Sequence, residues 1–551
     1  MGHGRFRDWL EEFLSHTSRG WSETKTSRQE RNRQARRLLL EGLEKRHLLA
    51  ALPQMLVDLN PGGVWSWASE FTEVGGVVFF ADESAGRGAD LWKTDGTRGG
   101  TAKVTTVAHE SLSPYACIGE LVSADGVLAF TVSDHRGSPD DVTDDRVQLW
   151  KSDGTSAGTK LVWDFGPAST VPMPSGADLT AVGGSVFGVL RAGAGGTSDT
   201  GYELFYSDLD ETNNFGTYLV KDINPGPDDS YPSDLLAFGG KLYFAADDGA
   251  HGRELWVSDG KEHGTEMVTN IKGAGLASPE DCGSYPAGLT AGDGMFFFSV
   301  LDPGKDEAPK TIEDNHFELW QSDGTTTGLV YAFEDGTTLP GGAYSFHGDP
   351  ELTYVPETGK LFGVVEFDDK EERSRDLVCW DERDMHHWNL NLGGDDVVGN
   401  LSPAFGLLGF GADDGVHGRE PWLTDGDSSN PSGTFMIKDI NDNGASLGFP
   451  TGDFFPVVGG AVYFPAYDDA HGEELWRSDG SVEGTELVAD INPNGHDGSY
   501  PHDLSVALGK LFFVANDGEH DDDPWALDPA APDLDFGDAP DPSYPTLLAN
   551  N

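Results

Sequence analysis

The sequence predicts an all-β protein, a single β-propeller of about nine four-stranded blades. Three observations predict this fold: one phrase recurs along the chain, the stretch between two copies has room for four short strands, and the two ends of the repeated region complete one another. The chain also contains 73 glycines in 551 residues, nearly twice the usual share of ~7%, which indicates many tight turns. A predominantly helical fold is therefore excluded.

The repeated phrase is clearest at Glu254 (ELWVSDGKEHGT), Glu474 (ELWRSDGSVEGT) and Glu318 (ELWQSDGTTTG), with further copies from Leu91 and Leu149. One aromatic residue marks each of nine copies: Trp92, Trp150, Phe205, Trp256, Trp320, Trp380, Trp422, Trp476 and Trp525. These landmarks lie 42 to 64 residues apart. A period of this length is typical of propeller blades.

Each repeat predicts four strands. The alternating segment KLYFAA from Lys241 predicts one strand, a DDGAHG turn follows, and ELWVS predicts the next. After the SDG turn comes a third strand, as at 218–223 in the preceding repeat. An Asn-Pro-Gly loop and a Ser-Tyr-Pro start, as at Ser230, then lead into a fourth strand such as DLLAF, which ends at a Gly-Gly turn.

The two ends of the repeated region predict a closed ring. The last repeat stops after its second strand, near 524–527, and the segment 55–62 (MLVDLNPG) copies the third strand and loop of 218–226. Pairing these ends leaves no long unpaired edge. We therefore expect one ring over residues 53–527, closed by N- and C-terminal strands. Eight blades are an alternative, because propellers usually have ~4 to 8 and the repeat at Trp380 is degenerate. A linear β-solenoid is the other alternative.

The ends of the chain differ from the ring in charge and pattern. Residues 1–50 carry 11 Lys and Arg against 7 Asp and Glu, whereas the remaining 501 residues carry 25 against 87. Apolar residues at helical spacing from Phe6 to Leu14 and an Arg-rich stretch over 28–51 predict a short, basic, helical arm over residues 1–52. Residues 528–551 form an acidic, Pro-rich linker.

Charge and hydropathy exclude several kinds of partner. A net charge of −62 on residues 51–551 argues against nucleic acid and anionic membranes. No segment approaches the ~18 apolar residues that cross a bilayer.

Three segments resemble parts of known families. The phrase ELWxxDGTxxGT is similar to the repeat of the ELWxxDGT family, a bacterial surface and secreted group, and the similarity covers most of residues 53–527. The segment 43–49 resembles the LEPR-XLL segment of planctomycete-type surface proteins, with Lys45 where that family has Pro. The segment 535–541 (DFGDAPD) resembles the start of a GEVED-type module, which implies a truncated further module. The resemblances imply an extracellular or cell-surface setting and no defined reaction.

Three pairs of adjacent acids are the candidate metal ligands. Each pair precedes a histidine within a tight loop: Asp247, Asp248, Asp413, Asp414, Asp468 and Asp469. Paired carboxylates and nearby carbonyl groups offer the oxygen ligands that Ca²⁺ binds at ~2.3 to 2.6 Å. The alternative is a set of solvated acidic turns that keep the surface soluble. The sequence thus makes Ca²⁺ a candidate ion and indicates no other cofactor.

Other repeated side chains fit structural roles. Six aspartates at the DG turn either contact a ligand or cap their own turn, and capping is favoured: Asp95, Asp153, Asp259, Asp323, Asp425 and Asp479. The landmark Trp residues could line a sugar-binding groove, but packing between blades is favoured. The histidines that follow the acid pairs belong to different blades, so a hydrogen bond within the turn is favoured over a shared zinc site.

No catalytic constellation is evident. The sequence has no GxSxG elbow, HExxH helix or phosphate loop, and its three cysteines form no CxxC pair. We therefore assign no catalytic residue and predict a non-catalytic, extracellular or cell-surface propeller with a structural or adhesive role that binds protein or polysaccharide. The alternative is a propeller hydrolase or lyase that acts on polysaccharide. The identity of the ligand, the oligomeric state and the mode of anchoring stay open.

Overall fold

The protein's computed structural model describes residues 52–61, 68–82, 89–107, 116–134, 146–167, 179–191, 200–212, 215–271, 283–302, 316–332, 352–369, 372–380, 399–427, 430–442, 444–447, 455–494 and 498–529. Apart from short 3₁₀ turns at Arg98–Gly100, Glu262–Gly264 and Pro431–Gly433, the regular structure of these residues is β-strand. No helix within the described ranges is long and apolar enough to cross a membrane.

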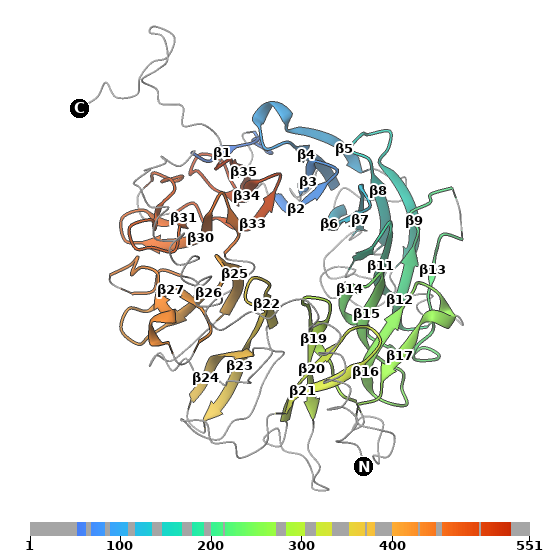
Figure 1. Ribbon diagram of the computed structural model, residues 1–551. Helices are drawn as coiled ribbons and strands as arrows, with labels where there is room; N and C mark the ends of the chain where they lie inside the picture. Colours follow the sequence, from blue (N-terminus) through green and yellow to red (C-terminus); the bar gives the residue numbers. More distant parts are fainter. Residues whose placement is uncertain are drawn as a thin grey trace, which may run out of the picture. The chain divides into compact units, whose positions relative to one another are not determined.

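The strands form nine antiparallel sheets arranged in a ring, which is a β-propeller (Figure 1). Blades 1 to 3 contain β2 (Ala68–Val74), β3 (Val77–Asp82), β4 (Ala89–Thr94), β5 (Ala102–Val107); β6 (Ala116–Ala124), β7 (Val127–Asp134), β8 (Arg146–Ser152), β9 (Lys160–Pro167); and β10 (Thr180–Val182), β11 (Ser185–Arg191), β12 (Tyr202–Ser207), β13 (Thr217–Leu219). Blades 4 to 6 contain β14 (Ser233–Phe238), β15 (Lys241–Asp247), β16 (Arg253–Ser258), β17 (Glu266–Thr269); β18 (Ala287–Ala291), β19 (Phe296–Asp302), β20 (His316–Ser322), β21 (Thr327–Ala332); and β22 (Leu352–Val355), β23 (Lys360–Asp369), β24 (Glu372–Trp380). Blades 7 to 9 contain β25 (Gly399–Ala404), β26 (Leu407–Asp413), β27 (Arg419–Thr424), β28 (Thr434–Met436); β29 (Val457–Val458), β30 (Ala461–Asp468), β31 (Gly472–Ser478), β32 (Glu486–Leu487); and β33 (His502–Ala507), β34 (Lys510–Ala515), β35 (Asp523–Leu527), β1 (Gln54–Met55).

The blade count is nine, as the landmarks predict. Blade 6, which holds the degenerate repeat at Trp380, is the one sheet with three strands among the described residues, and residues 381–398 after it lie outside them. The ring closes in blade 9, where β1 pairs with β35 and places Met55 opposite Trp525. The predicted closure by strands from both ends of the ring is therefore confirmed.

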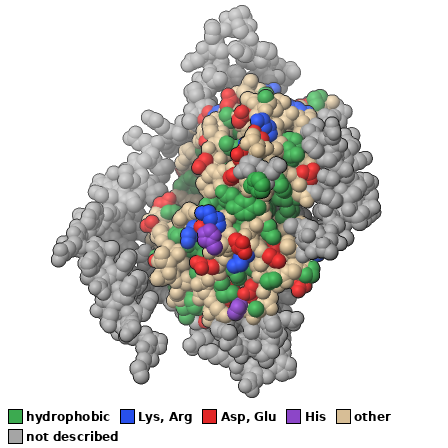
Figure 2. Space-filling view, turned by 90° about the vertical axis from the view of Figure 1, so that its right-hand side faces the viewer, with side chains coloured by type: hydrophobic (Ala, Val, Ile, Leu, Met, Phe, Trp, Pro, Cys, Tyr) green, Lys and Arg blue, Asp and Glu red, His purple; other side chains and the backbone are tan. Residues whose placement is uncertain are grey.

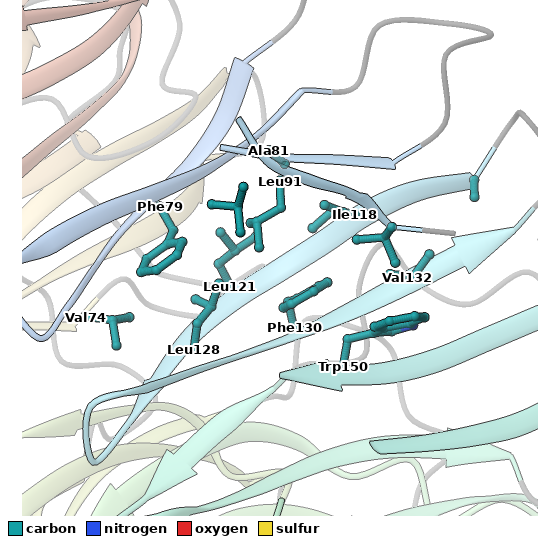
Figure 3. Close-up of a cluster of buried hydrophobic side chains, with 13 residues drawn as sticks. Val74, Phe79, Ala81, Leu91, Ile118, Leu121, Leu128, Phe130, Val132 and Trp150 are labelled. Carbon is teal, nitrogen blue, oxygen red and sulfur yellow. The ribbon is translucent and has the colours of Figure 1, made fainter. Parts of the chain in front are cut away.

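The hydrophobic core is divided among the spaces between blades. Figure 3 shows one such cluster, in which Phe79 and Leu91 of blade 1 meet Leu121 and Phe130 of blade 2. We call the interface between two neighbouring blades a joint. Comparable clusters fill the other eight joints, including the one between blades 9 and 1. Each blade is thus covered on both sides by its neighbours.

This stacking explains one difference from the sequence prediction. The segment at β15 was expected to alternate between buried and exposed residues, yet five successive residues, Leu242 to Ala246, are buried. A central strand of a blade packs against a neighbouring blade on each of its two faces. The side chains on both faces are therefore buried. The predicted strand at 218–223 is also shorter, because β13 ends at Leu219.

Candidate functional site

The two ends of the strands form two unlike faces of the ring. On one face, which we call the turn face, the first and second strands of a blade are joined by short turns such as Gly75–Gly76 and Gly239–Gly240, and the third and fourth strands by the DG turns. On the opposite face, the loop face, the number of residues between successive described strands varies widely, from 469–471 in blade 8 and 248–252 in blade 4 to 333–351 between blades 5 and 6, the last lying outside the described residues. Unequal loops on a regular scaffold are a common place for recognition.

The DG turn on the turn face is held by its own aspartate. In blade 1 the Asp95 carboxylate accepts hydrogen bonds from the backbone N–H of Thr97 at 2.9 Å and from its hydroxyl group at 2.6 Å. These bonds lower the pKa of Asp95. The Thr97 hydroxyl group in turn accepts from the N–H of Gly100 at 3.0 Å. The aspartate therefore caps its own turn, as the sequence favoured.

The glycine of the DG turn joins neighbouring blades. Its φ is positive, +84° at Gly154, and its carbonyl oxygen accepts a hydrogen bond from a side chain of the preceding blade. Lys93 donates to the Gly154 carbonyl at 2.8 Å, and the Tyr218 hydroxyl group donates to the Gly260 carbonyl at 2.8 Å. In the ring-closing joint, Lys510 donates to the Asp95 carbonyl at 3.2 Å. The DG turn is therefore a blade-to-blade contact.

The glutamate of the ELW phrase lies at a second kind of joint, towards the loop face. Glu203 is fully buried, and its carboxylate accepts from the Ser230 hydroxyl group at 2.6 Å and from the backbone N–H of Ile223 at 3.1 Å. Ser230 begins the next blade and its carbonyl oxygen accepts from the N–H of Asp247 there. The same serine-to-glutamate bond recurs at three other joints: Ser284–Glu254, Ser446–Glu420 and Ser499–Glu474.

Burial dominates the electrostatics of these glutamates. It raises the pKa of Glu203 and of Glu420 to about 7, and it also raises the pKa of Glu474. The hydrogen-bond donors oppose this shift, whereas Asp222, Asp439 and Asp490 add to it respectively. The sequence did not single out these glutamates, although the glutamate and the Ser-Tyr-Pro start recur in the same repeats.

The predicted calcium ligands lie in hairpin turns on the loop face. The Asp247 carboxylate accepts from the N–H of Gly249, and the Asp248 carboxylate accepts from the N–H groups of Ala250 and His251. Asp413 and Asp414 accept the corresponding hydrogen bonds in blade 7. In blade 8 the Asp468 carboxylate accepts from the N–H groups of Ala470 and His471, as Asp248 does in blade 4, and Asp469 is the next residue. Within the described ranges, no three His, Cys, Asp or Glu side chains group as a metal site would need. Calcium binding stays a prediction.

The histidines of these turns bond to their own turns, as favoured from the sequence. The Nδ1 atoms of His251 and His417 lie 2.7 Å from the Asp248 and Asp414 carboxylates, and that of His471 lies 2.9 Å from Asp468. Blade 9 contains a fourth copy that the sequence analysis missed, in which His520 lies 2.9 Å from Asp517. The pattern D-x-x-H, shared by all four turns, was the available signal.

Three tyrosines of the Ser-Tyr-Pro starts are exposed on the loop face. Tyr231, Tyr285 and Tyr500 expose 58%, 40% and 55% of their surface. Their φ values of +44°, +46° and +48° lie in the left-handed region, which is costly for a bulky residue.

In the view of Figure 2, hydrophobic side chains gather near the middle of one side of the ring with acidic side chains around them.

Carboxylates on the innermost strands also hold blades together. Glu70 on β2 accepts from the N–H of Leu121 in blade 2 at 3.0 Å, and Asp234 on β14 accepts from the N–H of Gly288 in blade 5 at 2.8 Å. Both acids have a positive φ and sit beside a shift in strand register. These inner acids therefore have a structural role.

The landmark tryptophans pack in or against the clusters between blades, and Trp92, Trp320 and Trp525 are partly buried there. Trp150, Trp256 and Trp476 expose 5% to 7% of their surface and belong to the clusters between blades. They are not available as an open sugar-binding groove.

Comparisons with known proteins find only distant similarities. No protein-family model and no curated protein matches it. Among solved structures it is similar to a mutant of puromycin hydrolase complexed with PGG, at 12% identity and a TM-score of 0.35 over 81% of this chain and 58% of that one. It is also similar to the β-propeller domain of the Trilobed protease from Pyrococcus furiosus, at 10% identity and a TM-score of 0.33 over 68% and 98% of the two chains.

A third similar structure is a puromycin-hydrolysing peptidase from Mycobacterium tuberculosis, at 11% identity and a TM-score of 0.36 over 86% and 63% of the two chains. The chain thus spans less than two thirds of the length of the puromycin-hydrolysing proteins that it matches. At these identities the activities in those names do not extend to this chain.

Proposed function

We propose that the protein is a non-catalytic binding propeller, extracellular or at the cell surface, whose loop face contacts a protein or a polysaccharide. The single observation that carries this proposal is the contrast between the two faces. On the turn face and at the joints, the residues of the repeated phrase make turn, core and blade-to-blade contacts. The loop face is where the connections differ from blade to blade, so a unique partner has unique residues to contact there.

The exposed tyrosines support the choice of the loop face. A left-handed backbone costs an L-residue roughly 1–2 kcal/mol, and Gly or Asn would adopt it more easily. The hydroxyl and backbone groups of the preceding serine, such as Ser230, already make the joint. The exposed ring of Tyr500 therefore serves contact with a partner better than it serves the fold, whereas the ring of Tyr231 also stacks on Tyr202 of the preceding blade at 6.0 Å.

The hydrolase or lyase alternative would use carboxyl groups near the central axis. Glycoside hydrolysis needs two carboxyl groups placed on either side of one bond. Glu70 and Asp234 on the innermost strands each accept a backbone hydrogen bond from the next blade. This engagement favours the binding role, and release of reducing ends from a polysaccharide would support the alternative instead.

Binding through the tyrosines is tested in the full chain by replacing all three. The variant Tyr231→Asn/Tyr285→Asn/Tyr500→Asn should fold as the wild type does, because Asn tolerates a positive φ. The migration of the variant is compared with that of the wild type in gels that contain cellulose derivatives, xylan or mannan. Biolayer interferometry on the immobilised polysaccharide that retards the wild type then gives the affinity of each protein. The matched control is Val482→Asn, which changes a side chain that is 58% exposed in a DG turn on the turn face.

We expect at least tenfold weaker binding for the tyrosine variant and unchanged binding for the control. Equal losses in both variants would reject the loop face as the binding surface. Unchanged binding in both would reject it as well.

Calcium stabilisation belongs to the same proposal and has its own test. If the acid turns bind Ca²⁺ only when folded, calcium at 100 times its dissociation constant adds ~2.7 kcal/mol per independent site. Thermal unfolding at fixed ionic strength, with EDTA or with millimolar CaCl₂, measures this directly. A rise in midpoint that Mg²⁺ and KCl fail to reproduce, and that Asp248→Asn/Asp414→Asn/Asp468→Asn removes, is the expected result. No rise would leave a metal-free ring with acidic turns.

A further inference from the structure

The three exposed tyrosines of the loop face lie on opposite sides of the axis of the propeller. Tyr231 and Tyr285 precede the innermost strands β14 and β18 of the neighbouring blades 4 and 5, and Tyr500 precedes β33 of blade 9. Counted around the nine blades, blade 9 is four steps from blade 4 in one direction and four steps from blade 5 in the other. Figure 1 accordingly shows blade 9 across the ring from blades 4 and 5. One tyrosine therefore lies opposite a pair.

Each tyrosine is held by its two neighbours in the chain. The preceding serine is fully buried and donates a hydrogen bond to the buried glutamate of the joint in all three cases: Ser230, Ser284 and Ser499. The following proline is buried as well. The backbone is thus fixed on both sides of the exposed side chain. A side chain presented from a fixed backbone loses little conformational entropy when a ligand binds to it.

The fold itself does not require an exposed side chain at this position. In blade 8 the residue after the serine of the joint is Leu447, whose N–H donates to the Arg419 carbonyl group at 3.0 Å. The N–H of Tyr285 donates in the same way to the Arg253 carbonyl group at 3.0 Å. Leu447 is nevertheless only 6% exposed and packs between blades 7 and 8. The outward tyrosines are therefore a particular feature of blades 4, 5 and 9.

Polar groups surround these tyrosines. Beside Tyr231, the Asp229 carboxylate accepts from the N–H of Tyr202 at 2.8 Å. The third tyrosine is followed closely by His502 and Asp503, whose side chains are 33% and 47% exposed. Among the described residues, the three tyrosines are the large hydrophobic side chains exposed at the starts of innermost strands.

This pattern fits a sugar chain better than a protein. A stable protein interface covers about 800 Å² on each partner around an apolar centre. Isolated aromatic side chains with polar neighbours instead suit pyranose rings, because an aromatic face packs on the apolar face of a sugar while polar groups bond its hydroxyl groups.

The charge of the propeller favours a neutral chain. Residues 51–551 carry a net charge of −62, and carboxylates lie near the tyrosines on both sides of the axis. An anionic polysaccharide would be repelled by them. Arg253, between the paired tyrosines, donates to the Tyr231 carbonyl group at 2.6 Å and also to the Ser233 hydroxyl group, so it has a role within blade 4.

We propose that the ligand of the loop face is a neutral, linear polysaccharide, and that one chain crosses the axis to contact Tyr500 on one side and Tyr231 with Tyr285 on the other. This inference rests on the proposed function and names its ligand. Once one side has bound, the other side meets the same chain at a high effective concentration, so the two contacts reinforce each other. A short oligosaccharide reaches one side only and lacks this gain.

The dependence of binding on chain length tests the crossing in the full-length wild type. Isothermal titration calorimetry compares hydroxyethyl cellulose, xylan and mannan with cellotriose, xylotriose and mannotriose. We expect the polysaccharide that binds to have at least about tenfold higher affinity, per trisaccharide unit, than its own trisaccharide. Equal affinities at the two lengths overturn the crossing. Polygalacturonate should bind at least about tenfold more weakly than the neutral polymer, and equally tight binding rejects a neutral ligand.

Variants on the two sides distinguish a crossing chain from one extended site on a single side. Tyr500→Asn and Tyr231→Asn/Tyr285→Asn should each reduce the gain with chain length to less than about threefold. Tyr500→Trp, which keeps an aromatic side chain, should retain the gain. The matched control is Val416→Asn, which changes a side chain that is 78% exposed in a hairpin of the same face, and it should retain the gain too. A full gain in either one-sided Asn variant overturns the crossing.

The outcomes also separate this inference from the proposed function. A wild type that binds none of the three neutral polysaccharides overturns the inference and leaves a protein as the ligand of the loop face. Polysaccharide binding that persists unchanged without all three tyrosines rejects both proposals. Circular dichroism confirms that each variant is folded, and the wild-type comparison of chain lengths does not depend on any variant.

Discussion

At the scale of single residues, the repeated phrase specifies a turn that its own aspartate caps and that contacts the neighbouring blade. The aspartate and first glycine of the DG turn could be predicted, because turn aspartates accept backbone N–H bonds and glycine supplies a positive φ. The second glycine could not be assigned a reason from the sequence. In the structure, a Cβ atom at Gly100 would overlap the Asp95 carboxylate, and Gly158, Gly264, Gly433 and Gly484 stand in the same relation to their own aspartates.

This crowding predicts a sharp difference between two adjacent glycines. Gly100→Ala must displace the aspartate that caps the turn, so we expect it to lower the free energy of unfolding by about 1–3 kcal/mol. Gly99→Ala, with no atom within 4 Å of its added Cβ, should change it by less than about 0.5 kcal/mol. Urea unfolding of the two variants gives both values. Equal effects at the two sites would mean that the capping aspartate is not what requires Gly100.

At the scale of the element, strands and turns could be predicted while the joints between blades could not. Runs of strand-forming residues bounded by Gly-containing turns are local signals, and they place β15 and β16 correctly, although β15 does not alternate between buried and exposed residues. The buried glutamates are a long-range feature: Glu254 is hydrogen-bonded to Ser284, which starts the next blade. Glutamate is a surface residue in most contexts, so a single sequence gives no reason to bury it.

The joint between blades 8 and 9 carries the second prediction. Ser499 is fully buried and donates to the Glu474 carboxylate at 2.5 Å, so Ser499→Ala leaves a buried carboxylate with one donor fewer. We expect a loss of about 1–3 kcal/mol in the free energy of unfolding. The Ser499 hydroxyl group favours the ionised form of Glu474, and the raised pKa of Glu474 keeps more of this carboxyl group protonated at pH 5 than at pH 8. The decrease in the free energy of unfolding caused by Ser499→Ala should therefore be larger at pH 8 than at pH 5.

Urea unfolding at the two pH values measures this effect. The control Ser156→Ala changes an exposed serine and should stay within about 0.5 kcal/mol at both. A loss for Ser499→Ala that is the same at pH 5 and pH 8 would show that the carboxylate does not depend on this donor.

At the scale of the whole molecule, the ring depends on a few scarce cations and on closure. The chain has only 36 Lys and Arg residues against 94 Asp and Glu residues. Several of its lysines span joints, as Lys151 does towards the Leu209 carbonyl and Lys360 towards the Asp425 carbonyl. A ring that repels itself over long distances is thus held by short contacts at every joint. The nine-fold count and the closure were predictable because both are visible as periodicity.

Closure carries the last prediction, because the segment 54–59 supplies both a strand and two core residues to the last joint. β1 pairs with β35, and Leu56 and Leu59 are 3% and 4% exposed. Burying a leucine contributes about 1.5–3 kcal/mol, so a variant that lacks residues 1–61 should lose several kcal/mol and expose the edge of β35. We expect a lower thermal midpoint and concentration-dependent aggregation. A variant that lacks only residues 1–52 keeps this segment and should unfold at the midpoint of the full chain. If the two truncations behaved alike, the last blade would not need its N-terminal strand, and the ring would be held shut by the side-chain contacts of the joints alone.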